Sequence, residues 1–249
     1  SAQEILYLNN SNGVWETIVA QETGTAGENW SACVTPNDAV TDGSAICSAN
    51  FTVLSDTCRD IAASTTLTAN VTSIGTCYNI TADNVVLDCA GYGITYGTVN
   101  AGNGVTADNR TNVTVQNCFI LDNSSTNSFG IGINFTRTNL SLIYNNTIDT
   151  NGTNDNYGIQ IATRSYTNRI ENNTIRTLGS GASNFGINII SNTRGNNATG
   201  NRINTNGTSA NYGIATQTDA SGTTITANNI TTTGTTSDNF GIYLVTRIN

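Results

Sequence analysis

A three-residue pattern, an aromatic residue followed by Gly and Ile, recurs through the second half of the chain. Its five copies begin at Phe129, Tyr157, Phe185, Tyr212 and Phe240. The steps between their glycines are 28, 28, 27 and 28 residues. A period of this length, held over five copies, is typical of architectures in which each repeat stacks on its neighbours.

Two further columns precede each triplet at nearly constant spacing. An apolar residue lies nine or ten positions before the aromatic, and an asparagine lies two positions before that apolar residue. The apolar column is Phe119, Ile148, Ile175, Ile203 and Ile230, and the asparagine column is Asn117, Asn146, Asn173, Asn201 and Asn228. A third column, directly before the aromatic, contains Ser128, Asn156, Asn184, Asn211 and Asn239. Such registration is not a chance pattern.

Each unit carries the marks of short strands joined by polar turns. Alternation with period two predicts that Phe129, Ile131 and Ile133 share one face of a strand. A second short strand is indicated in each unit by Val113/Val115, Leu140/Leu142, Ile170 and Ile225. Asn, Gly and Thr turns such as 151–154 separate the strands. No segment carries the apolar stripe of an amphipathic helix.

Several strands within about 28 residues, without a helix, predict an all-β chain folded as a parallel β-helix. A β-propeller blade needs about 40–50 residues, so the unit is too short for that rival. Coils would stack at about 4.8 Å. This spacing would build an inner isoleucine ladder, stack the aromatic rings and let turn asparagines form hydrogen bonds from coil to coil.

The repeat extends backwards from the triplets. Residues 84–89 match residues 112–118, and Asn103-Gly104-Val105 takes the place of the aromatic triplet in that coil. We therefore expect the coils to begin near residue 65, and we assign 57–249 to the β-helix domain. Residues 1–56 are assigned to an N-terminal β segment or cap with a role in assembly, because 5–8 and 14–19 have strand patterns.

The stretch from Thr76 to Ile94 resembles the opening coil of right-handed β-helix repeats in the pectate-lyase-like superfamily. It is most similar to the versions in archaeal and bacterial cell-surface proteins. The Asn-Asn-Thr-Ile turns at 145–148 and 172–175 fit the same pattern. The resemblance covers residues 57–249 and implies a right-handed parallel β-helix. It is specific for fold and weak for function, because this fold serves lyases, hydrolases, adhesins and scaffolds.

The chain has six cysteines, none with zinc-ribbon or CxxC spacing. An even count without metal spacing favours disulfides and an oxidising exterior over buried thiols in a cytosolic protein. Equivalent residues on stacked coils lie about 4.8 Å apart, within the Cα range that a disulfide accepts. Of the 15 conceivable pairings, the predicted pairs are Cys89–Cys118 by stacking, and Cys58–Cys77 and Cys33–Cys47 by proximity.

Composition removes whole classes of function. All nine basic residues are Arg, and the absence of Lys and His excludes serine-protease-like triads, histidine metal sites and Schiff-base lysines. The net charge is -8, and the nine scattered arginines do not form the basic patch that is typical of a nucleic-acid-binding protein. No apolar run approaches the ~20 residues of a membrane span. The chain starts at Ser1 rather than Met, so we expect processing or trimming.

Sixteen Asn-x-Ser/Thr sequons are candidate glycosylation sites, and their modest excess over chance gives weak support to secretion. They are Asn9, Asn29, Asn50, Asn70, Asn79, Asn109, Asn112, Asn123, Asn134, Asn139, Asn145, Asn151, Asn172, Asn197, Asn206 and Asn229.

The acidic residues offer little for catalysis. The enzymes that the fold resembles cleave acidic polysaccharides with clustered Asp residues, and their sequence signatures are absent here. The candidate acids are Asp83, Asp88, Asp108, Asp122 and Asp149, while Asp149–Asp155 has oxygen ligands without EF-hand spacing. Asp122 and Asp149 are 27 residues apart, so they are placed on neighbouring coils where a pair would bind calcium or raise one pKa. We favour solvated turn residues, and expect no catalytic residue, metal or cofactor.

The arginines offer a site for anionic sugars. Arg137 and Arg164 are 27 residues apart and are expected to stack on one edge, while Arg169, Arg194 and Arg202 sit near similar turns. We favour solvated edge residues over a binding site.

Two function classes remain. We expect an extracellular, non-enzymatic structural protein of a cell surface: a filament subunit, surface-layer component or adhesin. The alternative is a polysaccharide-binding or polysaccharide-cleaving β-helix protein. The strand at 240–245 is a full-strength repeat without a visible cap. We therefore expect heterologous, head-to-tail self-association between one chain's last coil and residues 1–56 of the next, together with N-glycans or carbohydrate ligands as partners.

Overall fold

The structure is a computed structural model that describes residues 29–31, 33–35, 43–48, 51–52, 57–123 and 130–245. The chain forms two compact units, Ser1–Ser55 and Asp56–Asn249. In the first unit, β1 (Asn29–Trp30) pairs antiparallel with β4 (Phe51–Thr52), and β2 (Cys33–Val34) with β3 (Ile46–Cys47). The strands expected at 5–8 and 14–19 lie outside the described residues.

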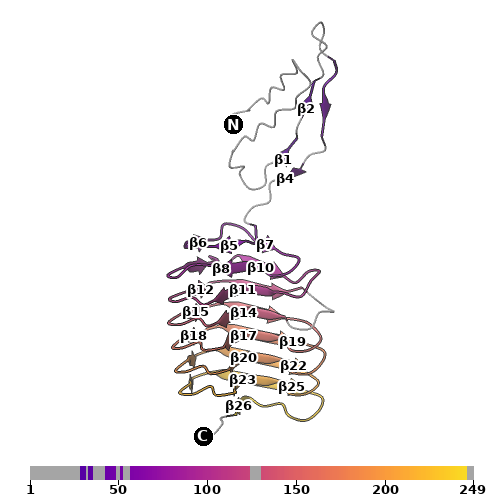
Figure 1. Cartoon of the computed structure of the whole chain (residues 1–249). Coiled ribbons are helices and arrows are strands. Elements are labelled where there is room, and N and C mark those ends of the chain that lie inside the picture. Colours follow the sequence, from indigo (N-terminus) through magenta and orange to yellow (C-terminus); the bar gives the residue numbers. More distant parts are fainter. Residues whose placement is uncertain are drawn as a thin grey trace. The chain divides into compact units, whose positions relative to one another are not determined.

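The second unit is a stack of coils whose strands form three parallel sheets (Figure 1). The eight-stranded sheet contains β5 (Asp60–Ile61), β8 (Tyr78–Ile80), β11 (Asn103–Asp108), β14 (Ile131–Thr136), β17 (Tyr157–Ala162), β20 (Phe185–Ile190), β23 (Tyr212–Gln217) and β26 (Ile242–Leu244). A seven-stranded sheet, here the β6 sheet, contains β6 (Thr65–Thr66), β9 (Val86–Asp88), β12 (Thr114–Gln116), β15 (Leu142–Tyr144), β18 (Arg169–Glu171), β21 (Asn197–Thr199) and β24 (Thr224–Thr226). The other, the β7 sheet, contains β7 (Val71–Thr72), β10 (Gly93–Tyr96), β13 (Phe119–Asp122), β16 (Thr147–Thr150), β19 (Thr174–Leu178), β22 (Arg202–Gly207) and β25 (Asn229–Gly234).

Each coil gives one strand to each sheet in turn, so every third strand along the chain lies side by side (Figure 1). This connectivity confirms the predicted all-β parallel β-helix. The coils begin earlier than expected, because β5 at Asp60–Ile61 already pairs with β8. The second strands predicted around Val113/Val115, Ile170 and Ile225 are confirmed as β12, β18 and β24. The Leu140/Leu142 prediction is out of register, because Leu140 lies before β15 and is 60% exposed, and Ile143 is the buried partner of Val115.

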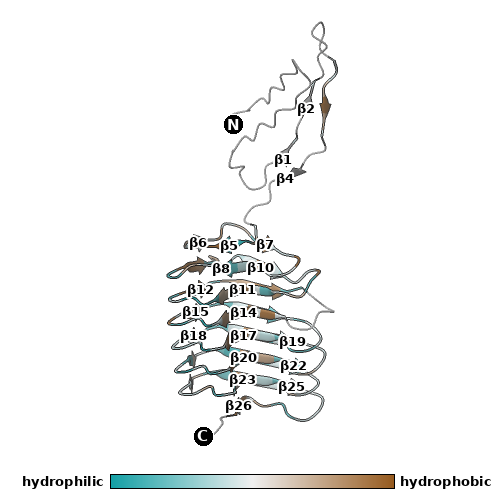
Figure 2. Ribbon diagram, in the orientation of Figure 1, coloured by the Kyte–Doolittle hydropathy of each residue, from teal (hydrophilic) through white to brown (hydrophobic). Residues whose placement is uncertain are grey.

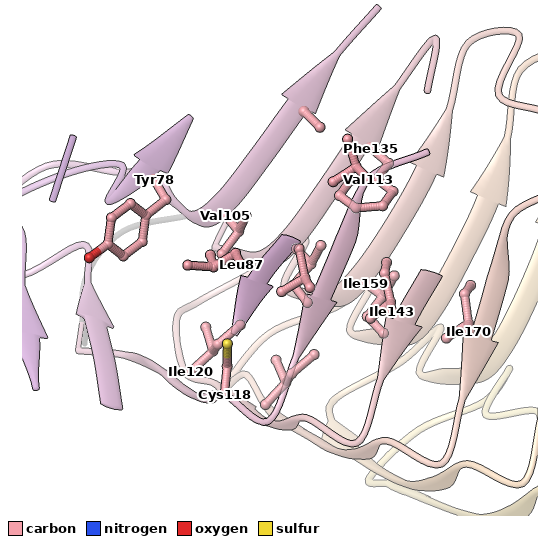
Figure 3. Packing of buried hydrophobic residues seen from close by; sticks show 14 of the residues in the cluster. Tyr78, Leu87, Val105, Val113, Cys118, Ile120, Phe135, Ile143, Ile159 and Ile170 are labelled. Atoms are coloured by element: carbon pink, nitrogen blue, oxygen red, sulfur yellow. The ribbon is translucent and has the colours of Figure 1, made fainter. Parts of the chain in front are cut away.

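Three isoleucine-rich ladders, one per sheet, fill the centre of the stack. On the β7 sheet, Ile120 pairs with Ile148 and Ile148 with Ile175. On the eight-stranded sheet, Val105, Ile133, Ile159, Ile187 and Ile214 are stacked and fully buried. Figure 3 shows members of this core pointing inward from successive strands. Burying each side chain contributes about 1.5–3 kcal/mol, so the ladders supply much of the stability.

The triplet register differs from the prediction by two residues in one coil. Tyr157 pairs with Ile131, rather than with Phe129, which lies outside the described residues. Gly132 is therefore the partner of Gly158, while Gly130 stands one position before the strand. The repeat of glycines in that coil, at 130 and 132, made both registers compatible with the sequence.

The aromatic and the isoleucine of a triplet do not share a face, which corrects the alternation predicted above. Gly158 and Ile159 are both buried, whereas Tyr157 and Gln160 are half-buried on the outside. Alternation breaks because the glycine also points inward: a Cβ on Gly158 would lie 2.2 Å from Ile175 Cγ2 and 2.7 Å from the Gly186 carbonyl oxygen. Only a residue without a side chain fits this close approach.

The coil at 117–120 also needed a one-residue correction. Ile120, which is buried, stacks on Ile148, and Phe119 instead pairs with Thr147 and is 42% exposed. Cys118 directly precedes β13, as Asn146 directly precedes β16 one coil later. The Cys118 backbone N–H donates to Asn146 Oδ1 at 3.0 Å, which places the two residues next to each other. Asn117 therefore falls outside the asparagine column to which we assigned it.

Candidate functional site

Three disulfides join Cys33 to Cys47, Cys58 to Cys77 and Cys89 to Cys118. These are the pairs predicted by stacking and proximity. The Cα atoms of Cys89 and Cys118 are 4.7 Å apart, which is the spacing of adjacent coils. Both residues are buried, so this cross-link lies inside the first coils of the stack. Three disulfides are typical of proteins that mature in an oxidising compartment.

A ladder of buried asparagine amides runs through the later coils. Asn173 Oδ1 accepts from the Asn146 backbone N–H at 2.9 Å and from Asn146 Nδ2 at 3.0 Å. Asn173 Nδ2 donates to the Ile143 carbonyl at 2.9 Å and to Asn201 Oδ1 at 3.0 Å. The pattern continues from Asn201 to Asn228. Coil-to-coil bonding by this column is thus confirmed, and the column is fully satisfied inside the protein.

The column that precedes the aromatic residue forms a second amide ladder. The Nδ2 atoms of Asn156, Asn184 and Asn211 donate to the Oδ1 atoms of Asn184, Asn211 and Asn239 at 2.8, 3.0 and 2.6 Å. The first three of these residues are fully buried. Ser128, the expected fifth member, lies outside the described residues.

A third polar ladder was missed in the sequence. Ser141, Asn168 and Asn196 stack at the turn before the β6 sheet, where Asn168 Oδ1 accepts from the Ser141 N–H and Asn196 Oδ1 accepts from the Asn168 N–H. Their spacings of 27 and 28 residues were the available signal. Figure 2 shows hydrophilic and hydrophobic residues interspersed along the coils.

The aromatic rings stack on the outside of the eight-stranded sheet. Tyr157, Phe185 and Tyr212 lie face to face, with ring centroids 5.1 and 4.8 Å apart and interplanar angles of 14°. Phe240 and Tyr243 continue the stack from Tyr212. The predicted ring stacking is confirmed, although it forms a cluster separate from the isoleucine core. Burial, with help from the Asp155 charge, raises the pKa of Tyr157 to about 12.

Both interpretations of Asp122 and Asp149 are wrong: the two residues do not form a pair, and they lie in strands β13 and β16 rather than in solvated turns. Leu121, not Asp122, pairs with Asp149, so alternation sends the two carboxylates to opposite faces of the β7 sheet. Asp122 is 2% exposed and faces inward. Burial raises the pKa of Tyr96 well above its ordinary value, and the charge of Asp122 adds to this shift. Asp149 faces outward and forms an ion pair with Arg176 at 3.2 Å.

The other candidate acids are engaged by neighbouring residues. Asp88 accepts hydrogen bonds from Asn117 Nδ2 at 3.0 Å and Gln116 Nε2 at 2.8 Å. The Asn117 bond is the main cause that lowers the pKa of Asp88. Asp83 accepts from the Thr111 N–H, and Asp108 forms an ion pair with Arg137. Over the part of the chain that the structure describes, no three His, Cys, Asp or Glu side chains gather as a metal site.

The arginines divide between a turn and two sheets. Arg137 and Arg164 occupy the turn between the eight-stranded and β6 sheets on adjacent coils, because the Arg137 N–H donates to the Thr163 carbonyl at 3.0 Å. Their expected stacking on one edge agrees with this placement. Arg194 lies at the same turn one coil further, where it forms a bridge with Tyr166. Arg169 and Arg202 instead lie on the β6 and β7 sheets, so they do not share that turn.

The sequons differ in accessibility. Nine described sequon asparagines are exposed: Asn70, Asn109, Asn112, Asn123, Asn145, Asn151, Asn172, Asn206 and Asn229. Four are half-buried: Asn79, Asn134, Asn139 and Asn197. The side chains of Asn9, Asn29 and Asn50 lie outside the description. Asn79 is engaged, since its Nδ2 donates to Asp60 Oδ1 at 3.1 Å and its Oδ1 accepts from Thr106. Glycosylation itself stays a prediction.

The fold and its ladders define a β-helix, and comparison with protein families agrees. The model of the right handed beta helix region matches residues 95–230, more than half of the chain, and the chain belongs to this family. A search of curated proteins found no match. The described residues contain no helix with the length and apolar character needed to cross a membrane.

Proposed function

We propose that this protein is an extracellular structural module of a cell surface, of the kind that builds filaments, surface layers or adhesive stalks. The observation that carries the proposal is the use of side chains for contact between coils. Three amide-based ladders, an aromatic stack and two disulfides hold one coil to the next. Such a stack is suited to rigidity along its axis, because each coil contacts only its neighbours.

The disulfides and the exposed sequons support an extracellular location. The state of the acids supports a non-enzymatic role. Asp88, Asp108 and Asp149 are each bound to a neighbouring side chain, and the one deeply buried acid, Asp122, points away from the outer surface. A lyase or hydrolase would need carboxylates that converge on a substrate.

Head-to-tail self-association is part of the proposal. Ile242 in β26 is 46% exposed, whereas its partner Ile214 in β23 is fully buried. Leu244 and Phe240 are 62% and 43% exposed. Apolar surface and strand edges of this kind favour a further β-structured body. We propose residues 1–56 of a neighbouring copy as that body, and such a contact does not close on itself.

Two experiments test this function. Electron microscopy and light scattering over rising concentration should show end-to-end particles, and a chain that stays monomeric at millimolar concentration would refute the assembly. Incubation with pectic and alginate-like polymers should release neither reducing ends nor unsaturated products. Release of either would assign the protein to the enzymatic alternative.

A further inference from the structure

The asparagine row that runs from Asn156 to Asn239 has no amide in the coil that precedes it. Tyr157 pairs with Ile131, so Gly130 holds in that coil the place that Asn156 holds in the next. The carboxyl group of Asp122 lies beside this place, because a Cβ on Gly130 would collide with Asp122 Oδ2 and would lie 3.3 Å from Asn156 Oδ1. The side chains of Asp122 and Asn156 therefore approach each other next to the Gly130 backbone.

Asp122 is in turn the exception in a column of threonines. Ile120 pairs with Ile148, so Asp122 and Thr150 hold equivalent positions on the inner face of the β7 sheet. The two following coils also have a buried threonine there, at 177 and 205. These later coils combine threonine on the strand with asparagine at the corner, whereas the coil of Asp122 combines an acid with glycine. The exchange keeps a polar group at the corner and supplies it from the other sheet.

Asn156 presents an acceptor to this carboxyl group. Asn156 Nδ2 donates to Asn184 Oδ1 at 2.8 Å. The Asn184 amide has a fixed orientation, because its Nδ2 donates both to the Gly181 carbonyl and to Asn211 Oδ1, each at 3.0 Å. Asn156 Oδ1 is therefore directed away from the row, and it is buried without a donor in the part of the chain that the structure describes. Because a buried acceptor without a donor is costly, this corner calls for a hydrogen-bond donor.

The surroundings of Asp122 favour a neutral acid over a carboxylate. Asp122 is 2% exposed, and no arginine is among the buried side chains of the described residues. Of the inward-facing residues in β10, β11, β14 and β16, the strands packed against β13, only Tyr96 is titratable. The sequence of the adjoining residues 124–129 contains no ionisable side chain. A charge in such an environment is costly, whereas a protonated carboxyl group has an O–H to donate.

We propose that Asp122 carries a proton in the folded protein at neutral pH and donates a hydrogen bond to Asn156 Oδ1. The acid then does for Asn156 what each asparagine does for the next one along the row. Bound to this site, the proton joins the β7 sheet to the corner of the eight-stranded sheet, and its loss sets a carboxylate against an amide oxygen. The site goes beyond the proposed structural role, because it makes the stability of the coils respond to pH. It is independent of end-to-end assembly, which is tested by particle size.

The sign of the pH dependence follows from the two protonation states. An aspartic acid in an unfolded chain ionises at about pH 4, whereas Asp122 keeps its proton in the folded chain to a higher pH. The stability that this proton provides is fully present below about pH 4 and is lost as the pH rises. Over that range the unfolding equilibrium constant of the parent protein, divided by that of a variant without the acid, should rise about tenfold for each pH unit.

Infrared spectroscopy of the full chain at neutral pH tests the protonation state directly. The parent protein should show the C=O band of a protonated carboxyl group, and Asp122→Asn, which keeps an N–H donor at this position, should lack it. The matched control Asp149→Asn removes an outward-facing carboxylate one coil later and should retain the band. Urea unfolding from about pH 4 to about pH 7 should show the tenfold change per pH unit between Asp122→Asn and the parent protein, and no such change for Asp149→Asn.

A double variant decides the question if Asp122→Asn does not fold. Asp122→Thr/Gly130→Asn introduces the residue types that the next coil has at 150 and 156, so its new amide can donate to Asn156 Oδ1. This variant should fold, lack the infrared band and be more stable than Asp122→Thr alone, which leaves Asn156 Oδ1 without a donor. The proposal is overturned if the parent protein shows no protonated carboxyl band at neutral pH, or if the band persists in the folded variants that lack Asp122.

Discussion

The coils up to residue 123 and the coils from residue 130 hold their register in different ways. In the first region the strands are short and the spacing is uneven: β5, β6 and β7 have two residues each, and four residues separate Asp88 from Gly93 where the next coil has two. Here two disulfides link the coils, and Cys89–Cys118 is buried at both ends. From β11 to β23 the strands of the eight-stranded sheet have six residues each, and in the second region asparagine ladders replace the cross-links.

The two devices meet at one residue. Cys118 forms the disulfide with Cys89 on one side and donates its backbone N–H to Asn146 Oδ1, the first rung of the ladder, on the other. An amide ladder needs the same residue on each successive coil, so it suits regular repeats. A disulfide needs only one matched pair, so it suits irregular coils. The comparison therefore predicts different sensitivities in the two regions.

The largest expected effect is in the ladder region. The variant Asn173→Ala leaves the buried Asn146 N–H without its partner and removes the three side-chain hydrogen bonds of Asn173 with Asn146 Nδ2, the Ile143 carbonyl and Asn201 Oδ1, which together costs about 4 kcal/mol of the free energy of unfolding. Urea unfolding measures the change. The control Asn204→Ala, on the exposed face of β22, should change it by less than about 0.5 kcal/mol. Equal effects would mean that the ladder adds nothing beyond ordinary surface contacts.

Removing the cross-link of the first region should have the next largest effect. Cys89→Ala/Cys118→Ala opens a loop with a sequence separation of 29 residues, and we expect a loss of about 3 kcal/mol. Hydrogen exchange should rise in β9 to β13 and stay unchanged in β20 and β23. If protection were lost equally along the whole stack, disulfides would not be the specific means that holds the register of the first region.

A glycine pair tests the close packing of the ladder region. In Gly186→Ala, the added Cβ would lie 2.2 Å from Ile203 Cγ2 and 2.6 Å from the Gly213 carbonyl oxygen, so we expect a loss of about 2 kcal/mol. Gly241→Ala is the matched control in the last coil, because the atom nearest to its added Cβ, Ile230 Cγ2, is 3.8 Å away. Thermal unfolding of both variants should separate them clearly, and similar midpoints would argue against the tight register.

The smallest effect concerns alkaline pH. The pKa of Tyr157 is about 12 in the folded protein and about 10 in an unfolded chain. Stability from its neutral form is present below pH 10 and is lost as the pH rises from 10 to 12. Because the ring is partly exposed, the loss is on the order of 1 kcal/mol. The free energy of unfolding of Tyr157→Phe, measured across this pH range, should not show this loss. If the variant and the parent protein lose the same stability between pH 10 and 12, Tyr157 is not its source.

The regular region was also the more predictable one. The isoleucine column from Ile148 to Ile230 and the asparagines at 173 and 201 were visible because identical residues recur at one spacing. Cys89 and Cys118 were paired correctly for the same reason. The register errors fell where the spacing changes, at Asn117 and Phe119 and at Gly130, because a local insertion moves the register without changing the composition. The wrong face assigned to the aromatics has another cause, the inward-pointing glycine of the regular coils. Asp122 was misplaced by the same slip, since a shift of one residue reverses the face.

The asparagine ladders also have a direction. From Asn146 to Asn228, from Asn156 to Asn239 and from Asn168 to Asn196, each amide donates to the next coil towards the C-terminus. Reversing a single amide would set two oxygens or two NH₂ groups against each other. In the rows from Asn146 and Asn168, the backbone N–H groups that donate to the Oδ1 atoms of the next coil fix the direction of every amide. Aligned amide dipoles strengthen one another and sum along the axis, much as peptide dipoles do in a helix. The stack of coils therefore has a chemical direction: in each row the amide donors serve the next coil towards the C-terminus and the amide acceptors serve the preceding coil.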